Sequence, residues 1–129
     1  MKVSIIGMGY VGLSNAVLLS LKNNVVCHDI DTSKLECINK RISPIKDSLI
    51  TSYFKNKKLR LTTSERIDKE MSKSDFIIIS TPTDFDVQKK TFNTSSIDVI
   101  LKKLNSLKST AHIIIKSTLP IGYTKKVNS

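Results

Sequence analysis

The chain has 129 residues, of which 40% are hydrophobic and 25% are charged. This length and composition predict one globular domain and exclude a disordered or fibrous chain. The longest unbroken apolar runs, 16–19 and 76–79, have four residues. A membrane span needs about 20, so we expect no transmembrane helix and no membrane partner.

The chain is strongly basic, with 21 Lys and Arg against 11 Asp and Glu and a formal net charge of +10. Its arginines are Arg41, Arg60 and Arg66, its lysines are spread over the whole length, and aromatic residues make up 5%. Nucleic-acid-binding proteins usually gather basic residues on one face and place aromatic residues among them. We therefore predict a solvated basic surface and no nucleic-acid partner, although a positive field attracts anionic small molecules such as nucleotides.

The two cysteines and two histidines predict neither a disulfide nor a metal site. Cys27 and Cys37 form no CxxC pair, which favours free thiols in a reducing cytoplasm. His28 and His112 have no Cys, His or acidic residue at ligand spacing. The apolar stretch after Lys2 is interrupted by glycines and leads to no small-residue cleavage site, so we expect no signal peptide and a cytoplasmic location.

Short apolar runs alternate with stretches of helical periodicity along the whole chain. Runs of β-branched residues ended by Gly or polar residues favour strands, and apolar residues three or four apart favour helices. The pattern predicts, in chain order, a strand over 2–6, a helix over 10–22, a strand over 25–28, a helix from 31 or 32 to 42, a helical turn or two around 49–53, a short strand over 59–62, a helix carrying 67 and 71, a strand over 76–80, a polar loop over 81–93, a helix reaching 107, a strand over 112–116 and the opening of a further helix after 122.

Capping residues mark the starts of three of these helices. Asp31 or Thr32 is a candidate N-cap for the second helix, which Pro44 would end. Thr62-x-x-Glu65 has the spacing of a capping box before Ile67. One of residues 93, 94 and 95 is expected to cap the helix that carries the apolar positions 97, 100, 101, 104 and 107.

Strand and helix alternation predicts the fold class. Consecutive parallel strands need crossover connections, which are usually helices. We therefore expect an α/β fold, a Rossmann-type doubly wound parallel sheet of about five strands, over residues 1–129. The chain reads as the front of a larger protein, because this fold usually continues beyond such a length.

The segment Gly7-Met8-Gly9-Tyr10-Val11-Gly12 has the dinucleotide-binding pattern G-x-G-x-x-G between a strand and a helix. Gly7 permits the tight turn, Gly9 leaves room for a pyrophosphate, and Gly12 lets the helix pack closely on the sheet. Tyr10 and Val11 begin the helix, whose N-terminus offers unpaired N–H groups and a positive dipole end to phosphates. A glycine-rich turn without a ligand is the alternative. We expect all five residues to bind the cofactor.

Asp29 follows the second strand, 22 residues after Gly7, where a carboxylate can accept hydrogen bonds from both adenosine ribose hydroxyls. It would repel a 2′-phosphate, so NAD is favoured over NADP. Asp31 is a rival for the ribose but suits the helix cap better. Lys34, in the first turn of the next helix, is a further candidate at the adenosine end of the cofactor.

Five sequence blocks in order resemble the UDP-glucose/GDP-mannose dehydrogenase family. The resemblance covers the whole chain, and the two last blocks favour the branch acting on UDP-glucose. The blocks are G-Y-V-G-L-S at 9–14, I-S-P-I-x-D at 42–47, S-T-P-T at 80–83, F-N-T-S-S at 92–96 and I-K-S-T-L-P-I-G at 115–122.

The resemblance implies two further site residues and a reaction. Thr83 matches a residue that contacts the nicotinamide ribose. Thr118 matches a residue beside the nicotinamide that positions the catalytic water and stabilises the oxyanion. The family oxidises the C6 alcohol of a nucleotide sugar such as UDP-glucose to a carboxylate with two NAD, through an aldehyde held on a cysteine.

The resemblance also implies that parts of the family protein are missing here. The family's nucleophilic cysteine, its catalytic lysine and asparagine, its central helix and its C-terminal UDP-sugar domain would all lie beyond residue 129. We therefore expect the chain to bind NAD without turnover, and the full-length protein to be a homodimer. The alternatives are a dehydrogenase of the same family for GDP-mannose or a UDP-N-acetyl-hexosamine, and a stand-alone NAD-sensing module.

Overall fold

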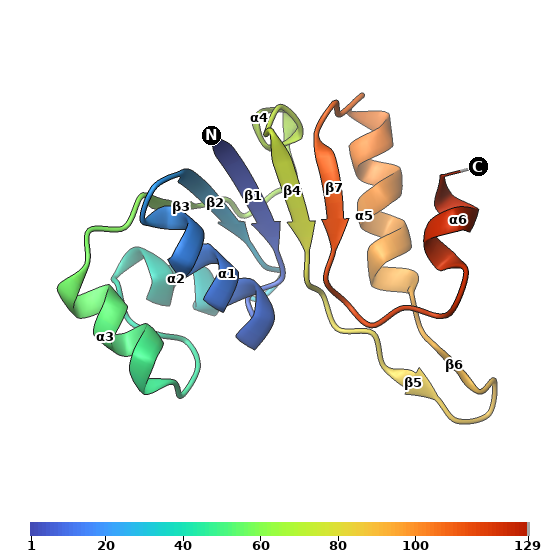
Figure 1. Cartoon of the computed structure of the whole chain (residues 1–129), viewed down its shortest axis with the longest axis horizontal. Helices are drawn as coiled ribbons and strands as arrows, with labels where there is room; N and C mark the ends of the chain where they lie inside the picture. Colours follow the sequence, from blue (N-terminus) through green and yellow to red (C-terminus); the bar gives the residue numbers. More distant parts are fainter. Residues whose placement is uncertain (129) are drawn as a thin grey trace.

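A parallel sheet of five strands forms the centre of the molecule (Figure 1). The structure is a computed structural model that describes residues 1–128. The strands of the sheet are β1 Lys2–Ile6, β2 Asn24–His28, β3 Leu61–Thr63, β4 Phe76–Ile79 and β7 His112–Ile115. Their order across the sheet is β3-β2-β1-β4-β7, and every neighbouring pair is parallel. This matches the first five positions of the doubly wound order 3-2-1-4-5-6 and confirms the predicted fold class.

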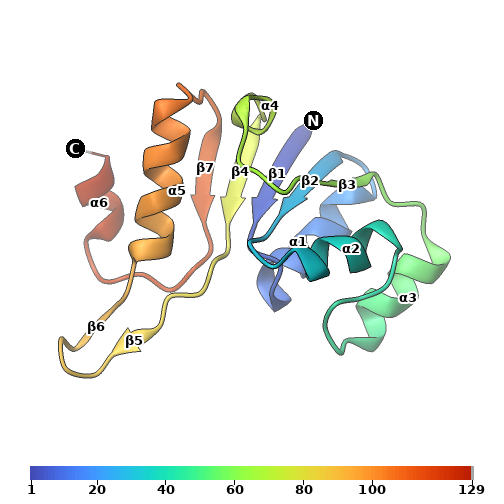
Figure 2. The ribbon, with the colours of Figure 1, turned by 180° about the vertical axis from the view of Figure 1, so that it is seen from behind.

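Helices cover both faces of the sheet, as the prediction of a doubly wound fold requires. In chain order they are α1 Tyr10–Ser20, α2 Thr32–Asn39, α3 Ser48–Asn56, α4 Lys69–Ser72, α5 Ser95–Ser106 and α6 Tyr123–Val127. Figures 1 and 2 show α1, α2 and α3 gathered beside β1, β2 and β3, and α5 and α6 gathered beside β7. None of the helices within residues 1–128 is long and apolar enough to cross a bilayer.

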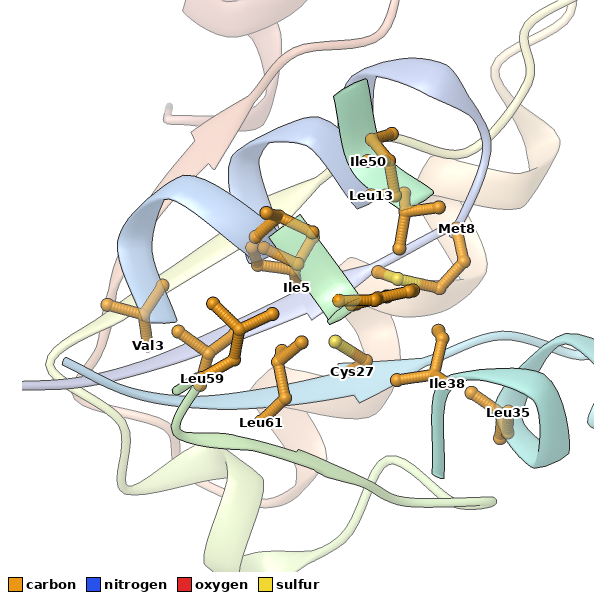
Figure 3. Close-up of a cluster of buried hydrophobic side chains, with 14 of the residues drawn as sticks. Val3, Ile5, Met8, Leu13, Cys27, Leu35, Ile38, Ile50, Leu59 and Leu61 are labelled. Atoms are coloured by element: carbon orange, nitrogen blue, oxygen red, sulfur yellow. The ribbon is translucent and has the colours of Figure 1, made fainter. Parts of the chain in front are cut away.

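Successive side chains along each strand point to opposite faces of the sheet, so the core is divided into two clusters. On one face, Val3 and Ile5 of β1 pack with Leu13 of α1 and Cys27 of β2, beneath apolar residues of α2 and α3 (Figure 3). On the other face, Ile6 joins buried side chains of β4, α4, α5 and α6; these are Met71, Ile77, Ile79, Ile97, Ile100, Leu104 and Tyr123. Both faces of the central strands are therefore buried, which explains their continuous apolar sequences.

The segment predicted as a polar loop contains a small antiparallel hairpin, β5 Phe85–Asp86 with β6 Thr91–Phe92. It extends away from the sheet beyond the end of β4 (Figure 1). Phe85 and Phe92 pair across it in an edge-to-face contact with ring centroids 5.2 Å apart. Strands of two residues give no period that sequence alone could reveal.

Helix α2 ends before the predicted end at Ile42. The N–H groups of Arg41 and Ile42 donate to the carbonyls of Ile38 and Cys37 at 3.0 and 2.8 Å. Arg41 has a φ of +59°, in the left-handed region. This is a Schellman termination, in which the residue after the C-cap turns the chain away from the helix axis. Ile42 is consequently exposed rather than part of the helical face.

The side chain of Arg41 holds this turn against the edge of the sheet. Its guanidinium donates to the carbonyls of Leu59 and Leu61, at 3.3 and 3.0 Å. Leu61 begins β3, the edge strand on this side of the sheet. The guanidinium therefore occupies backbone acceptors that an exposed edge would leave open.

The predicted capping box at Thr62 is wrong. Thr62 lies in β3, paired with Val26, and its hydroxyl donates to the Val25 carbonyl at 3.4 Å. The helix that follows is the short α4, capped by Asp68, whose carboxylate accepts from the Met71 N–H at 2.8 Å. Pairing in the sheet has overridden a local capping preference, as tertiary contacts often do.

Candidate functional site

The carboxyl ends of the parallel strands meet at one end of the sheet, where ligands of open α/β sheets bind. The glycine loop follows β1 there, and the start of α1 and the β5–β6 hairpin lie at the same end (Figure 1). Every residue predicted to bind the cofactor comes from a loop or first helical turn after β1, β2, β4 or β7. The sheet therefore gathers residues that are more than one hundred positions apart in sequence.

Two glycines of the loop are required by the backbone itself. Gly7 has a φ of +99°, and a Cβ placed on it would lie 2.8 Å from the carbonyl group of Ser80. A Cβ on Gly12 would lie 1.7 Å from the carbonyl oxygen of Gly7. Any side chain at Gly12 would therefore push α1 away from the loop, as the predicted close packing implies.

Gly9 is different, because a Cβ placed on it would meet no heavy atom within 4 Å. Its backbone, with φ −81° and ψ −162°, is extended and suits any residue. No contact within residues 1–128 requires glycine at this position. The open space lies at the N-terminus of α1, where N–H groups have no intrahelical partner, so an anionic group can approach the backbone closely.

Asp29 clamps the glycine loop. Its carboxylate accepts the N–H of Met8 at 2.7 Å and the N–H of Asp31 at 2.8 Å, one on each oxygen. Each oxygen of an ionised carboxylate has a second acceptor position. Asp29, only half-buried, can therefore hold the loop and still accept hydrogen bonds from two ligand hydroxyls. The sequence indicated the second role but not the first.

Asp31 caps α2, as the sequence favoured, and its carboxylate is therefore already engaged in hydrogen bonds within the helix start. Its carboxylate accepts from both the hydroxyl and the N–H of Ser33. The hydroxyl bond from Ser33, its N–H bond and the positive charge of Lys34 lower the pKa of Asp31. Lys34 is half-buried in the first turn of α2, as the third residue of that helix and three positions after Asp31.

Tyr10 and Val11 form the exposed start of α1, with relative exposures of 59% and 47%. The Tyr10 hydroxyl donates to the carbonyl of Lys46 at 3.2 Å. This bond ties the start of α1 to the connection between α2 and α3. Both residues directly follow Gly9, so their backbone lies next to the open space there, while their side chains are exposed.

Thr83 and Thr118 are brought together although 35 residues separate them. The Thr83 hydroxyl donates to the backbone carbonyl of Thr118 at 2.6 Å. A second bond, from the Ser117 hydroxyl to the Thr81 carbonyl at 2.6 Å, ties the same two loops. The Thr83 oxygen keeps acceptor capacity, and the exposed Thr118 hydroxyl has no hydrogen-bond partner within residues 1–128.

An apolar cavity of about 420 Å³ lies beside Asp29. Its size is within the range of small-molecule sites, about 300–1,000 Å³. Its wall comes from the ends of β1 and β2, the loops after β3 and β4, and α5, and includes Ile6, His28, Ile67, Pro82, Val99 and Ile100. Of the residues that line the cavity, only Gly7 and Asp29 were predicted to bind the cofactor, because the others come from separate segments that no single sequence pattern joins.

Within residues 1–128, the Cys27 thiol is enclosed by the core and no metal-binding group is formed. Cys27 is fully buried in the core (Figure 3), and this burial raises the pKa of its thiol to about 12. Such a thiol is not a nucleophile at neutral pH. No group of three or more His, Cys, Asp or Glu side chains in residues 1–128 is placed to hold a metal ion.

Comparison with known proteins finds similar sequences among UDP-glucose 6-dehydrogenases. The UDP-glucose 6-dehydrogenase of Campylobacter jejuni is 46% identical over 129 residues, covering 98% of this chain and 33% of the relative. That of Streptococcus pneumoniae is 44% identical, covering 98% of this chain and 32% of the relative. The chain thus spans about a third of the length of these relatives.

Solved structures and a family profile agree. A ternary complex of GDP-mannose dehydrogenase from Pseudomonas aeruginosa superposes with a TM-score of 0.85 at 25% identity, covering 98% of this chain and 30% of that one. Residues 1–129 match the profile described as "UDP-glucose/GDP-mannose dehydrogenase family, NAD binding domain". With the glycine loop, Asp29 and the sheet order already described, the chain belongs to the UDP-glucose/GDP-mannose dehydrogenase family, of which it forms the NAD-binding domain.

Proposed function

We propose that this chain is the NAD-binding part of a UDP-glucose 6-dehydrogenase. The protein would oxidise the C6 alcohol of UDP-glucose to a carboxylate, with bound NAD accepting a hydride in each of two steps. The identities of 46% and 44% to two UDP-glucose 6-dehydrogenases favour this sugar over GDP-mannose or a UDP-N-acetyl-hexosamine. Full-length homodimer formation is part of the same proposal.

The position of Asp29 carries the proposal of NAD binding. Its carboxylate lies against the glycine loop through the Met8 N–H and borders the apolar cavity. In this place it would accept the adenosine ribose hydroxyls, with Lys34 nearby in α2 and the adenine in the cavity. The pyrophosphate would lie over Gly9, where space is open beside the N-terminus of α1.

The tied loops at Thr83 and Thr118 would hold the other end of the cofactor. Since Thr83 already donates to the Thr118 carbonyl, its oxygen would act as an acceptor toward a hydroxyl of the nicotinamide ribose. The exposed Thr118 hydroxyl can both donate and accept. It would orient the catalytic water and donate to the developing oxyanion.

The chain alone would bind NAD but not complete the reaction. Cys27 holds its proton at neutral pH, and Cys37 lies on α2 beside the adenosine end. The outer edge of β7 is unpaired within residues 1–128, and Ile113 and Ile114 are about 40% exposed. This apolar edge supports the view that residues 1–129 work as one domain of a longer enzyme.

The direct test is calorimetric titration of the 129-residue chain with NAD and with NADP. We expect NAD to bind and NADP to bind more weakly. Asp29→Asn should weaken NAD at least about tenfold, because hydrogen bonds to a charged acceptor contribute about 1.5–3 kcal/mol, and should reduce the discrimination against NADP. Asp31→Asn is the matched control: it changes a carboxylate that caps α2 and should leave NAD affinity nearly unchanged.

Three results would contradict parts of the proposal. Absence of NAD binding at millimolar concentration would remove the cofactor assignment. Oxidation of UDP-glucose to the C6 carboxylate by the isolated chain would contradict the expected lack of complete turnover, because the second oxidation needs a nucleophile to hold the aldehyde. Unchanged affinity in Asp29→Asn would show that the carboxylate serves only the loop.

A further inference from the structure

His28 is the one histidine in the cavity wall, and its two ring nitrogens are in different situations. It is the last residue of β2, directly before Asp29, and is paired in register with Ile6 of β1. The residue as a whole is 7% exposed. A buried imidazole normally has both nitrogens hydrogen-bonded, so each nitrogen has to be accounted for.

The first nitrogen sets the tautomer. Nδ1 lies 2.8 Å from the backbone carbonyl oxygen of Ser64, in the loop after β3. A carbonyl oxygen can only accept, so Nδ1 carries the hydrogen and donates it. In the neutral ring Nε2 is then an acceptor.

The second nitrogen faces open space. Nε2 has no hydrogen-bond partner among residues 1–128. Nε2 is also not fully enclosed by protein. Among the described residues, the fully buried side-chain nitrogen or oxygen without a hydrogen-bond partner is Ser80 Oγ, and Nε2 is not such an atom. The accessible space that borders His28 is the apolar cavity. His28 therefore adds a hydrogen-bond acceptor to a mostly apolar wall.

We propose that His28 recognises the 6-amino group of adenine, with Nε2 accepting a hydrogen bond from it while Nδ1 remains bound to Ser64. The inference rests on the proposed placement of the adenosine ribose at Asp29, which puts the attached base beside the adjacent residue. Adenine has apolar faces that suit Ile67 and Val99, and its amino group is a hydrogen-bond donor. His28 thus makes the cavity selective for adenine over 6-oxopurines.

The experiment compares binding of NAD and of nicotinamide hypoxanthine dinucleotide to the 129-residue chain by calorimetry. The hypoxanthine analogue has a carbonyl oxygen in place of the 6-amino group, so an acceptor would face Nε2. We expect NAD to bind about three- to tenfold more tightly than the analogue, the effect of one net hydrogen bond.

Variants separate the two nitrogens. The amide nitrogen of His28→Asn can replace Nδ1 in the bond to Ser64, but no atom reaches the position of Nε2, so this variant should bind both dinucleotides equally while keeping a similar melting temperature. His28→Gln carries an amide oxygen at the reach of Nε2 and should restore part of the preference. Ile67→Val, which changes the same cavity without a polar atom, should keep the wild-type ratio.

The outcomes distinguish this inference from the proposed function. Equal binding of both dinucleotides by the wild type, or an unchanged ratio in His28→Asn, would overturn the role of His28 while leaving NAD binding intact. Failure of the wild type to bind either dinucleotide would overturn the NAD assignment itself and this inference with it.

Discussion

Substitution of Gly9 by alanine separates cofactor binding from folding. The Gly9 backbone is extended, and a Cβ at this position would touch no heavy atom within 4 Å. The free protein should therefore accept Ala at position 9 with the loop and α1 unchanged. The added methyl group occupies the open space at the start of α1 into which a pyrophosphate would fit.

The expected magnitudes follow from these contacts. Alanine restricts the unfolded chain, which stabilises by about 0.4–1 kcal/mol at a compatible site, but alanine is a poorer N-cap than glycine by a similar amount. The free energy of unfolding should thus change by less than about 1 kcal/mol. The methyl would displace the pyrophosphate, and loss of one hydrogen bond to a charged group weakens binding by about 10- to 150-fold.

The assay pairs urea denaturation with NAD titration for Gly9→Ala and for Gly12→Ala. The second variant is the matched control, since its Cβ would lie 1.7 Å from the Gly7 carbonyl oxygen. It should lose several kcal/mol of stability, on the scale of overpacking a core. If Gly9→Ala binds NAD within threefold of the wild type, the pyrophosphate does not lie over Gly9. If Gly9→Ala unfolds as readily as Gly12→Ala, the space beside Gly9 is too small for a methyl group.

Three further predictions concern stability. Arg41→Met removes the guanidinium that donates to Leu59 and Leu61, so urea denaturation should show a loss of about 1–3 kcal/mol; no loss would mean that these bonds are not stabilising. Ser80→Ala removes a buried hydroxyl without a protein partner in residues 1–128, so the melting temperature should rise; a fall would indicate a bound water. Cys27 keeps its proton in the folded protein up to a pKa of about 12, against 9.0 for a free thiol. Below pH 9 stability should be independent of this group; above it the unfolded chain ionises first, and the free energy of unfolding should fall by up to about 1.4 kcal/mol per pH unit. A slope unchanged in Cys27→Ala would assign it to other groups.

Much of the site could be predicted from sequence because its chemistry is local. The G-x-G-x-x-G pattern between a β-branched run and a helical period predicts a strand, a tight turn and an open helix N-terminus from Gly7 to Gly12. The placement of Asp29 after the second strand follows from the same unit. The family relationship was also visible in the sequence, because five blocks occur in order along the chain, and the match over residues 1–129 confirms it.

Other features depend on contacts that no local pattern encodes. The clamp from Asp29 to the Met8 N–H, the bond from Thr83 to Thr118 and the cavity around His28 all join segments from different strands. Tertiary contacts also explain why the predicted capping box was wrong, because pairing of Thr62 in the sheet outweighed its local preference for capping a helix.

The sequence by itself thus determined the strands of the central sheet, the main helices beside them, the glycine loop and the nature of the cofactor. Only the tertiary structure decided which side chains meet at the carboxyl ends of the strands and which acceptors stay open to a ligand. The physical reason is that the spacing of hydrophobic residues along the sequence specifies which faces of helices and strands become buried. The distances between residues far apart in the chain depend instead on strand order and loop conformation.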